Sequence, residues 1–231
     1  MVREITRYPV KSFAGESMES CPLHAYGLYG DRYCAFYDET KQGWASFITA
    51  RDIPEMLGYQ AKLVDGVVNV TAPNGERFSW NDELLQEIQK KSRRKISMSG
   101  YQAPHPTRSN LMSVDQASIL VITDSSLRHL ERIWGKKVDR RRFRANLLLS
   151  LDGKHNERDW IGKHLLFGDA VLEVQASCER CSLITIDPDT CESDFTLLGT
   201  VYEELDLSFG VYARVRKTGH IQVGQTVYVT D

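Results

Sequence analysis

Apolar and polar residues alternate along the first third of the chain, which is the pattern of half-buried β-strands. Asp65 and Gly66 separate two alternating runs, 61–64 and 67–71, and predict a tight hairpin. Further strands are predicted at 2–10, 17–23, 32–37, 44–48 and 77–80. This region is therefore predicted to be rich in β-structure.

Two segments have helical spacing instead. Residues 81–91 start with an asparagine N-cap, continue with acids and end in bases, an order that complements the helix dipole. Further on, Thr123 or Asp124 caps a short helix with one apolar face, and Gly135 is well placed to end it. Between them, residues 99–107 are rich in turn formers and predict a loop or domain junction.

Short apolar runs separated by turns dominate the second half. Strands are predicted at 117–122, 143–149, 164–167, 170–174, 183–186, 211–215 and 227–229. Many short strands with frequent turns favour a barrel or closed sheet over a sandwich or a βαβ fold. The fold is therefore predicted to be mainly β with a few helices.

Composition places the chain in an ordinary class. Its 231 residues are 42% apolar and 26% charged, which is typical of a soluble protein with a substantial core. No apolar run approaches the ~20 residues of a membrane helix, so no membrane span is expected. The N-terminus enters a strand pattern at once and has no signal-peptide core, which predicts a cytoplasmic location.

The net charge of -2 gives no overall attraction to nucleic acid, but two basic runs stand out. Residues 90–95 are most simply the solvated end of the first helix. Residues 136–144 lead into the apolar run 147–149, and some of these arginines could face an anion from a strand. A nucleic-acid patch is an alternative, but no aromatic-interleaved binding motif accompanies it, and no nucleic-acid partner is expected.

Five cysteines, an odd number, do not resemble a secreted disulfide framework. Cys21 and Cys34 lie in apolar surroundings and are expected to be buried as small hydrophobes. Cys178 and Cys181 form a Cys-x-x-Cys pair that could be a redox dithiol, half of a zinc site or inert core thiols. A structural zinc normally takes four ligands, and no second pair exists. A dithiol would need its pair at a helix start, whereas a strand is predicted at 183–186.

An ordered series of motifs runs along nearly the whole chain. It comprises Tyr8–Ser12, Gly30–Arg32, Phe47–Arg51, Arg142–Asn146, Trp160–Gly162, Cys178–Cys181 with Asp187–Thr190, Phe209–Tyr212 and Gly219–Gly224. This series resembles the MOSC family, named for the C-terminal domain of molybdenum cofactor sulfurase. It is most similar to members with an extra N-terminal β-barrel domain, which include the mitochondrial amidoxime reducing component and its bacterial relatives.

The resemblance implies a barrel-like fold that binds a molybdenum cofactor (molybdopterin), with an N-terminal β-barrel domain at 1–98 and a MOSC domain at 99–231. The family's metal-binding cysteine matches Cys181. The same match places the cofactor pocket at Lys11, Ser12, Arg32, Arg144, Asn146, Glu179 and Arg180. Thr123 is a weaker match to a pocket serine or threonine.

The chemistry of these residue types agrees with the match. A metal-binding cysteine must be a thiolate, and a free thiol with a pKa near ~8.5 is mostly protonated at neutral pH. Arg180 beside Cys181 is expected to favour the anion. Molybdopterin carries a phosphate and anionic sulfurs, which suit arginine and lysine donors. Asn146 can pair with a pterin edge, and the Thr123 hydroxyl at a helix start would add an anion site.

The chain departs from the family pattern at two positions. Ala145 replaces a frequent proline, which changes little beyond strand shape. Cys191 stands where many members have glycine, and is a spare thiol near the pocket, a structural residue or a sign of a different activity. The sequence ends soon after the predicted barrel, at Asp231, so the ferredoxin-like domain of some bacterial relatives is not expected.

The resemblance implies an oxidoreductase that reduces N-hydroxylated small molecules by oxygen-atom abstraction at molybdenum. Cys181 would be the catalytic metal ligand, and a separate electron-donor protein would be required. The alternative is a non-catalytic carrier of the cofactor, or of sulfur as a cysteine persulfide, in cofactor maturation. A plain β-barrel interaction module is the third option, but it would leave the pocket arginines without a role.

Overall fold

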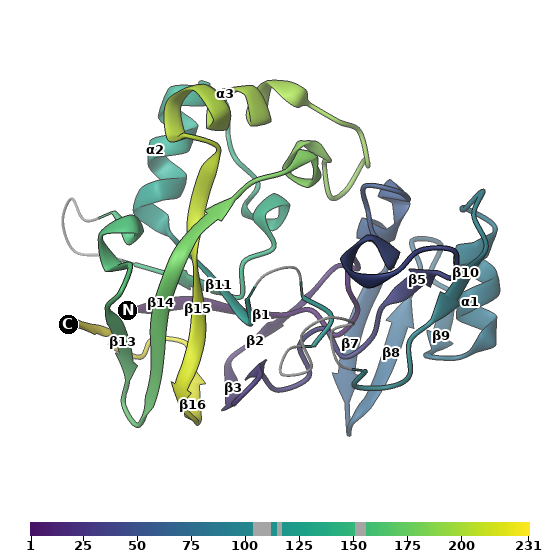
Figure 1. Cartoon of the computed structure of the whole chain (residues 1–231), viewed down its shortest axis with the longest axis horizontal. Coiled ribbons are helices and arrows are strands. Elements are labelled where there is room, and N and C mark those ends of the chain that lie inside the picture. Colours follow the sequence, from purple (N-terminus) through teal and green to yellow (C-terminus); the bar gives the residue numbers. More distant parts are fainter. Residues whose placement is uncertain (104–111, 115–116, 151–155) are drawn as a thin grey trace.

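The computed structural model describes residues 1–103, 112–114, 117–150 and 156–231. Figure 1 shows two groups of elements that lie side by side. The N-terminal group contains β5 (Phe36–Asp38), β6 (Phe47–Ile48), β7 (Gln60–Val64), β8 (Val67–Thr71), β9 (Arg77–Ser79), α1 (Asp82–Gln89) and β10 (Ile96–Met98). They form two three-stranded sheets, β10-β5-β6 and β7-β8-β9.

An eight-stranded sheet dominates the other group, in the order β17-β13-β14-β15-β11-β12-β1-β2. Its strands are β1 (Val2–Arg7), β2 (Glu16–Met18), β11 (Ile119–Thr123), β12 (Leu147–Leu149), β13 (His164–Phe167), β14 (Ala170–Glu179), β15 (Ser208–Lys217) and β17 (Tyr228–Thr230). β1 pairs with β12, so the first strand of the chain belongs to a sheet of the second half. The domain division at 98/99 remains a prediction.

A third small sheet, β16-β3-β4, consists of β3 (Ser20–His24), β4 (Gly27–Leu28) and β16 (Gly219–Gln222). It packs with the large sheet around one apolar core, and a separate core fills the N-terminal group. Among the described residues no sheet closes on itself. The prediction of a mainly β fold with a few helices is confirmed, but the barrel is not.

Two of the three α-helices in the described part of the chain were predicted. In α1 the side chain of Asn81 accepts a hydrogen bond from the Leu84 amide, as an N-cap does. In α2 (Asp124–Trp134) Thr123 is the N-cap, and Gly135 ends the helix with φ of 75°. Among the described residues no helix combines the length and the apolar character needed to cross a membrane.

The third helix, α3 (Phe195–Leu205), was missed. Its interior carries Gly199 and β-branched residues, which lower helix propensity, and its first turn has no acidic residue after the Asp194 cap. Packing outweighs this weak local signal. Leu197 and Val201 are buried together with Leu130 of α2 in a third apolar core.

Several predicted strands are partly or wholly wrong; the run 32–37, for example, is a strand only at its end, in β5. Residues 183–186 fall on a 3₁₀ turn, η5 (Ser182–Thr185), because an apolar run of four residues does not separate a strand from a helical turn. The run 143–149 is a strand only over β12, after the turn η3 (Arg140–Phe143). The run 44–48 is the turn η1 (Gly43–Ser46) followed by β6. Part of the predicted loop 99–107 lies outside the described residues.

Candidate functional site

A cavity of about 310 Å³ lies between the two groups of elements. Its walls come from loops after β1 and β4, from the turn before β12, and from the end of β14. Eight of the nine predicted site residues line it: Lys11, Ser12, Arg32, Arg144, Asn146, Glu179, Arg180 and Cys181. Segments more than a hundred residues apart in the sequence therefore meet at one site.

Thr123 is the ninth predicted residue, and it is not among the cavity lining. Its side chain is completely buried. The hydroxyl accepts a hydrogen bond from the Ser126 amide (3.1 Å) and donates to a Glu157 carboxylate oxygen (2.9 Å). These contacts make Thr123 a helix cap. The sequence predicted this role as well as the pocket role.

The backbone is strained at three cavity residues. Ser12, Arg32 and Arg144 have φ values of 67°, 51° and 55°, in the left-handed region that costs a non-glycine residue roughly 1 kcal/mol or more. Arg144 takes this conformation because it ends the turn η3, which corrects the prediction that it alternates along a strand. Strain gathered at one cavity is typical of functional sites.

The ring of Tyr8 lies between two of the cavity's guanidinium groups. The Arg32 and Arg144 Cζ atoms are 4.5 Å and 4.3 Å from its centroid, within the range of cation–π attraction. Burial raises the pKa of Tyr8, so the phenol stays neutral at physiological pH. Asp31 adds to the arrangement, because its carboxylate accepts bonds from Arg32 (2.5 Å) and from the Tyr8 amide (2.7 Å).

Lys11 and Arg180 are buried cations of the same cavity, 6% and 8% exposed. The Lys11 Nζ donates to the Ser113 carbonyl (3.2 Å) and lies 4.5 Å from the Phe47 ring centroid. Arg180 donates to the Cys178 sulfur (2.8 Å) and the Phe143 carbonyl (2.9 Å). Its Nε is buried without a hydrogen-bond partner in the described part of the chain. A buried donor of this kind is costly unless a ligand satisfies it.

The two cysteines of the Cys-x-x-Cys pair have different surroundings. Cys178 is buried in β14, whereas Cys181 is exposed at the start of η5. Arg180 contacts Cys178 and not Cys181, which corrects the expected pairing. The cation beside Cys181 is instead Arg51, whose Nη1 is 3.7 Å from the Cys181 sulfur.

The sequence argument against a redox dithiol loses its basis here, because a turn and not a strand follows the pair. All five cysteines are free, and Cys21 and Cys34 are buried as predicted. Burial raises the pKa of the Cys21 thiol to about 11 and also raises that of Cys34. These two thiols are therefore protonated and inert near neutral pH.

Asn146 and Glu179 meet the cavity in different ways. The buried Asn146 amide accepts from the Leu120 amide (3.1 Å) and donates to the Thr6 carbonyl (3.2 Å), so it joins β11 to β1. Glu179 is exposed at the end of β14 and is the only carboxylate among the residues that line the cavity in the described part of the chain. Its surroundings are otherwise cationic.

The lining residues that were not predicted individually include Trp44, Thr49 and Arg51. The motif Phe47–Arg51 contains two of them, but nothing in one sequence shows which of its side chains faces a cavity. The sequence feature that could have suggested a site here is an arginine, Arg51, seven residues after a tryptophan, Trp44. The Arg51 Cζ lies 5.1 Å from the Trp44 ring centroid.

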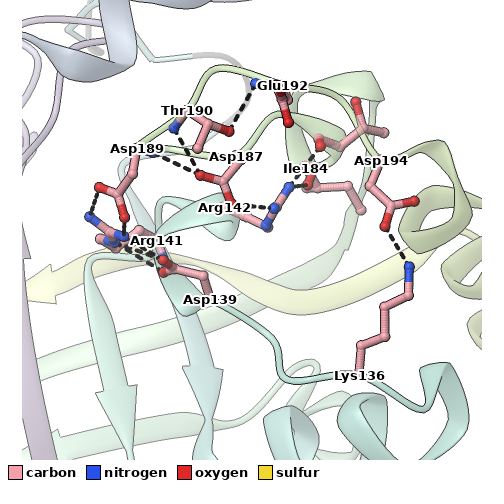
Figure 2. Close-up of polar contacts among 11 residues, drawn as sticks. Lys136, Asp139, Arg141, Arg142, Ile184, Asp187, Asp189, Thr190, Glu192 and Asp194 are labelled. Carbon is pink, nitrogen blue, oxygen red and sulfur yellow. Dashed lines mark hydrogen bonds and ion pairs between the residues drawn. The ribbon is translucent and has the colours of Figure 1, made fainter.

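A network of ion pairs fixes the turn that follows Cys181 (Figure 2). The Arg142 guanidinium donates to the Ile184 and Thr185 carbonyls (3.3 Å and 2.7 Å) and to the Asp187 carboxylate (2.7 Å). Hydrogen bonds from the Thr190 and Asp189 amides, together with the charge of Arg142, hold the pKa of Asp187 below its usual range. Arg142 thereby ties η5 to the turn that presents Arg144.

The rest of the basic run is also engaged in ion pairs. Arg141 pairs with Asp139 and Asp189, and Lys136 pairs with Asp194, as Figure 2 shows. Arg140 pairs with Glu4. These partners, rather than an external polyanion, account for most of the charge of this run.

Cys191 lies outside the cavity lining. Its φ of 61° explains why glycine suits this position, and its thiol donates to the Pro54 carbonyl (3.4 Å). Burial raises its pKa. Of the three roles considered for Cys191, the structural one agrees with these contacts. Among the described residues, no three His, Cys, Asp or Glu side chains group closely enough to hold a metal by themselves.

Comparison with known proteins gives matches over both halves of the chain. The family model of the MOSC domain matches residues 108–228, and that of the MOSC N-terminal beta barrel domain matches residues 1–111. The mouse mitochondrial amidoxime-reducing component 1 is 25% identical, with 99% of this chain and 82% of the mouse protein aligned. A molybdenum cofactor sulfurase from Drosophila ananassae is 32% identical over 67% of this chain, but the aligned part is only 20% of the sulfurase.

Among solved structures, the YuaD protein from Bacillus subtilis superimposes with a TM-score of 0.54. The superposition covers 99% of this chain and 93% of YuaD at 12% sequence identity. At 12% identity this similarity shows a shared fold and nothing further.

Proposed function

The chain belongs to the MOSC family, and on that premise we propose that it is a molybdenum-cofactor oxidoreductase that reduces N-hydroxylated compounds. The observation that carries the proposal is one cavity that combines an exposed cysteine with buried cations from separate segments. The name of the mouse relative, an amidoxime-reducing component, supports the choice of substrate class.

The residues present fit a phosphorylated, sulfur-bearing cofactor. Lys11, Arg32, Arg144 and Arg180 would bind its anionic groups, and the unpartnered Nε of Arg180 offers a donor for one of them. Bidentate arginine contacts suit a phosphate. A volume of about 310 Å³ lies at the lower end of the usual range for small-molecule sites.

Cys181 would be the protein ligand to the metal, since its thiol is exposed in the cavity while that of Cys178 is buried. A metal requires the thiolate form of a cysteine. The nearest cation to this sulfur is Arg51, at 3.7 Å. When bound, the cofactor would supply oxygen-atom abstraction from an N–O bond. The chain's own residues would hold the cofactor and orient it.

Three further residues complete the proposed site. Ser12, in its strained backbone segment, would contact the cofactor. Glu179 lies on the exposed side of the cavity. Asn146 holds the cavity wall in place by joining β11 to β1. We leave Thr123 out of the set because its hydroxyl is engaged elsewhere. A separate electron-donor protein would complete the turnover.

The second candidate is a carrier of the cofactor or of sulfur. The sulfurase relative favours it, and an exposed Cys181 could bear a persulfide as well as bind a metal. A carrier also needs its sulfur to be accessible to the acceptor, so the exposure of Cys181 does not favour one candidate over the other. Both candidates use the same cysteine, so only turnover separates them.

The test is an assay of benzamidoxime reduction with a chemical reductant, using protein expressed in a host that makes the cofactor. Wild type and Cys178→Ser are expected to form benzamidine, and Cys181→Ser is not. A cofactor-loaded wild type that forms no benzamidine would contradict the enzyme and favour the carrier. Transfer of labelled sulfur from Cys181 would then identify the carrier directly.

A further inference from the structure

The cavity has an exposed rim that differs from its buried interior. Trp44, in η1, is 47% exposed, and Arg51 is exposed just after β6. Both line the cavity, and they come from the N-terminal group of elements. The buried cations that suit the cofactor are a separate set, so these two side chains are available for another ligand.

Arg51 carries a charge without a counterion in the described part of the chain. Its guanidinium donates to the Thr49 hydroxyl (3.3 Å), contacts the Cys181 sulfur (3.7 Å) and stacks on Trp44. The neighbouring Asp52 is already used, because its carboxylate accepts from Arg94 (2.9 Å) and the Thr49 amide (3.0 Å). Arg51 therefore presents its positive charge to solvent beside the exposed Cys181 sulfur.

We propose that Trp44 and Arg51 form a substrate subsite that selects planar aromatic N-hydroxy compounds bearing a negative charge. This inference rests on the proposed function and specifies its substrate class. The tryptophan ring offers an apolar face on which an aromatic substrate can stack. The guanidinium offers two parallel donors that match a carboxylate. A cationic substrate would meet Arg51 with the same sign of charge.

Charge selection at this rim is expected to be substantial. A carboxylate about 5 Å from Arg51, partly exposed to water, gains an attraction that corresponds to about a tenfold preference over a neutral analogue. A cationic analogue is expected to be disfavoured by a similar factor. Salt should weaken both effects, because the rim is exposed.

The experiment compares 4-carboxybenzamidoxime, benzamidoxime and 4-(aminomethyl)benzamidoxime with the cofactor-loaded protein. Calorimetry gives their dissociation constants and the assay above gives kcat/KM. Wild type is expected to prefer the anion, then the neutral compound, then the cation. Arg51→Gln is expected to lose about tenfold of the preference for the anion, and Arg51→Lys to keep most of it. Trp44→Leu is expected to weaken all three compounds alike, without changing their order.

Two results would overturn the subsite. One is equal binding of the three compounds to wild type. The other is loss of molybdenum from Arg51→Gln protein, which would assign Arg51 to the cofactor. Binding separates this proposal from the proposed function, because charge-ordered binding without turnover would refute the enzyme and retain the subsite.

Discussion

Arg142 is predicted to be a major stabilising residue of the site, and its replacement by methionine tests this. Its side chain is 9% exposed and joins η3 to η5 through two backbone carbonyls and the Asp187 carboxylate. Methionine keeps much of the apolar stem but donates no hydrogen bond. The variant leaves two carbonyls and one carboxylate without this donor.

The expected loss follows from these three contacts. The bond to the Thr185 carbonyl contributes about 1 kcal/mol, the longer one to the Ile184 carbonyl about 0.5 kcal/mol, and the bond to the carboxylate about 1.5–3 kcal/mol. The carboxylate keeps the Asp189 and Thr190 amides and is 31% exposed, so we expect a total near 3 kcal/mol. With about 2.1 cal/mol/K of unfolding entropy per residue, 231 residues give a Tm decrease of about 6 °C.

Arg141→Met is the matched control. Arg141 makes ion pairs with two carboxylates at 2.5–2.6 Å, but its side chain is 46% exposed. Exposed ion pairs contribute about 0–1 kcal/mol, so its Tm decrease should be about 2 °C or less. Urea and thermal unfolding of cofactor-free protein measure both variants. Equal losses, or a larger loss in Arg141→Met, would refute the view that burial rather than ion-pair number decides the effect.

Three further predictions follow from the same structure. Tyr8→Leu should weaken cofactor binding about tenfold, measured as pterin retained after dilution, whereas Tyr8→Phe keeps the ring between Arg32 and Arg144 and should bind normally; equal loss in both would exclude the cation–π role. Thr123→Ala should lower the free energy of unfolding by about 1–2 kcal/mol through loss of the α2 N-cap. Its molybdenum content should stay at the wild-type level, and a drop would return Thr123 to the site. Lys136 lowers the pKa of Asp194 to about 2, so this carboxylate stabilises the fold above pH about 4 and loses its contribution as the pH falls through about 2. Asp194→Asn should therefore lose less stability between pH 4 and pH 2 than wild type, and an identical acid profile would contradict the ion pair.

Elements with strong local signals could be predicted from the sequence. The hairpin β7–β8 follows from the Asp65–Gly66 turn between alternating runs. Helix α2 follows from its cap, its apolar face and its terminal glycine. Prediction failed for α3 and for the apolar turn η5, because their local sequence signals are weak and tertiary packing determines their conformation.

The site was predictable in its residue types but not in its contacts. Cationic residues in the matching motifs predicted many of the residues that line the cavity. Adjacency in the sequence, however, suggested that Arg180 contacts Cys181. In the fold Arg180, directly after β14, donates to Cys178, and Arg51 contacts Cys181 from 130 positions away. Pairings over such separations depend on tertiary structure, which one sequence does not encode in any local pattern.

In the proposed function Cys181 holds molybdenum in this cavity. The direct measurement is the molybdenum and pterin content per chain, by mass spectrometry and pterin fluorescence, after expression in a host that makes the cofactor. Cys178→Ser is the matched control, because its sulfur is buried three residues away. We predict about one molybdenum per chain in wild type and Cys178→Ser, and little or none in Cys181→Ser. Wild-type protein without molybdenum, or full molybdenum in Cys181→Ser, would contradict the assignment.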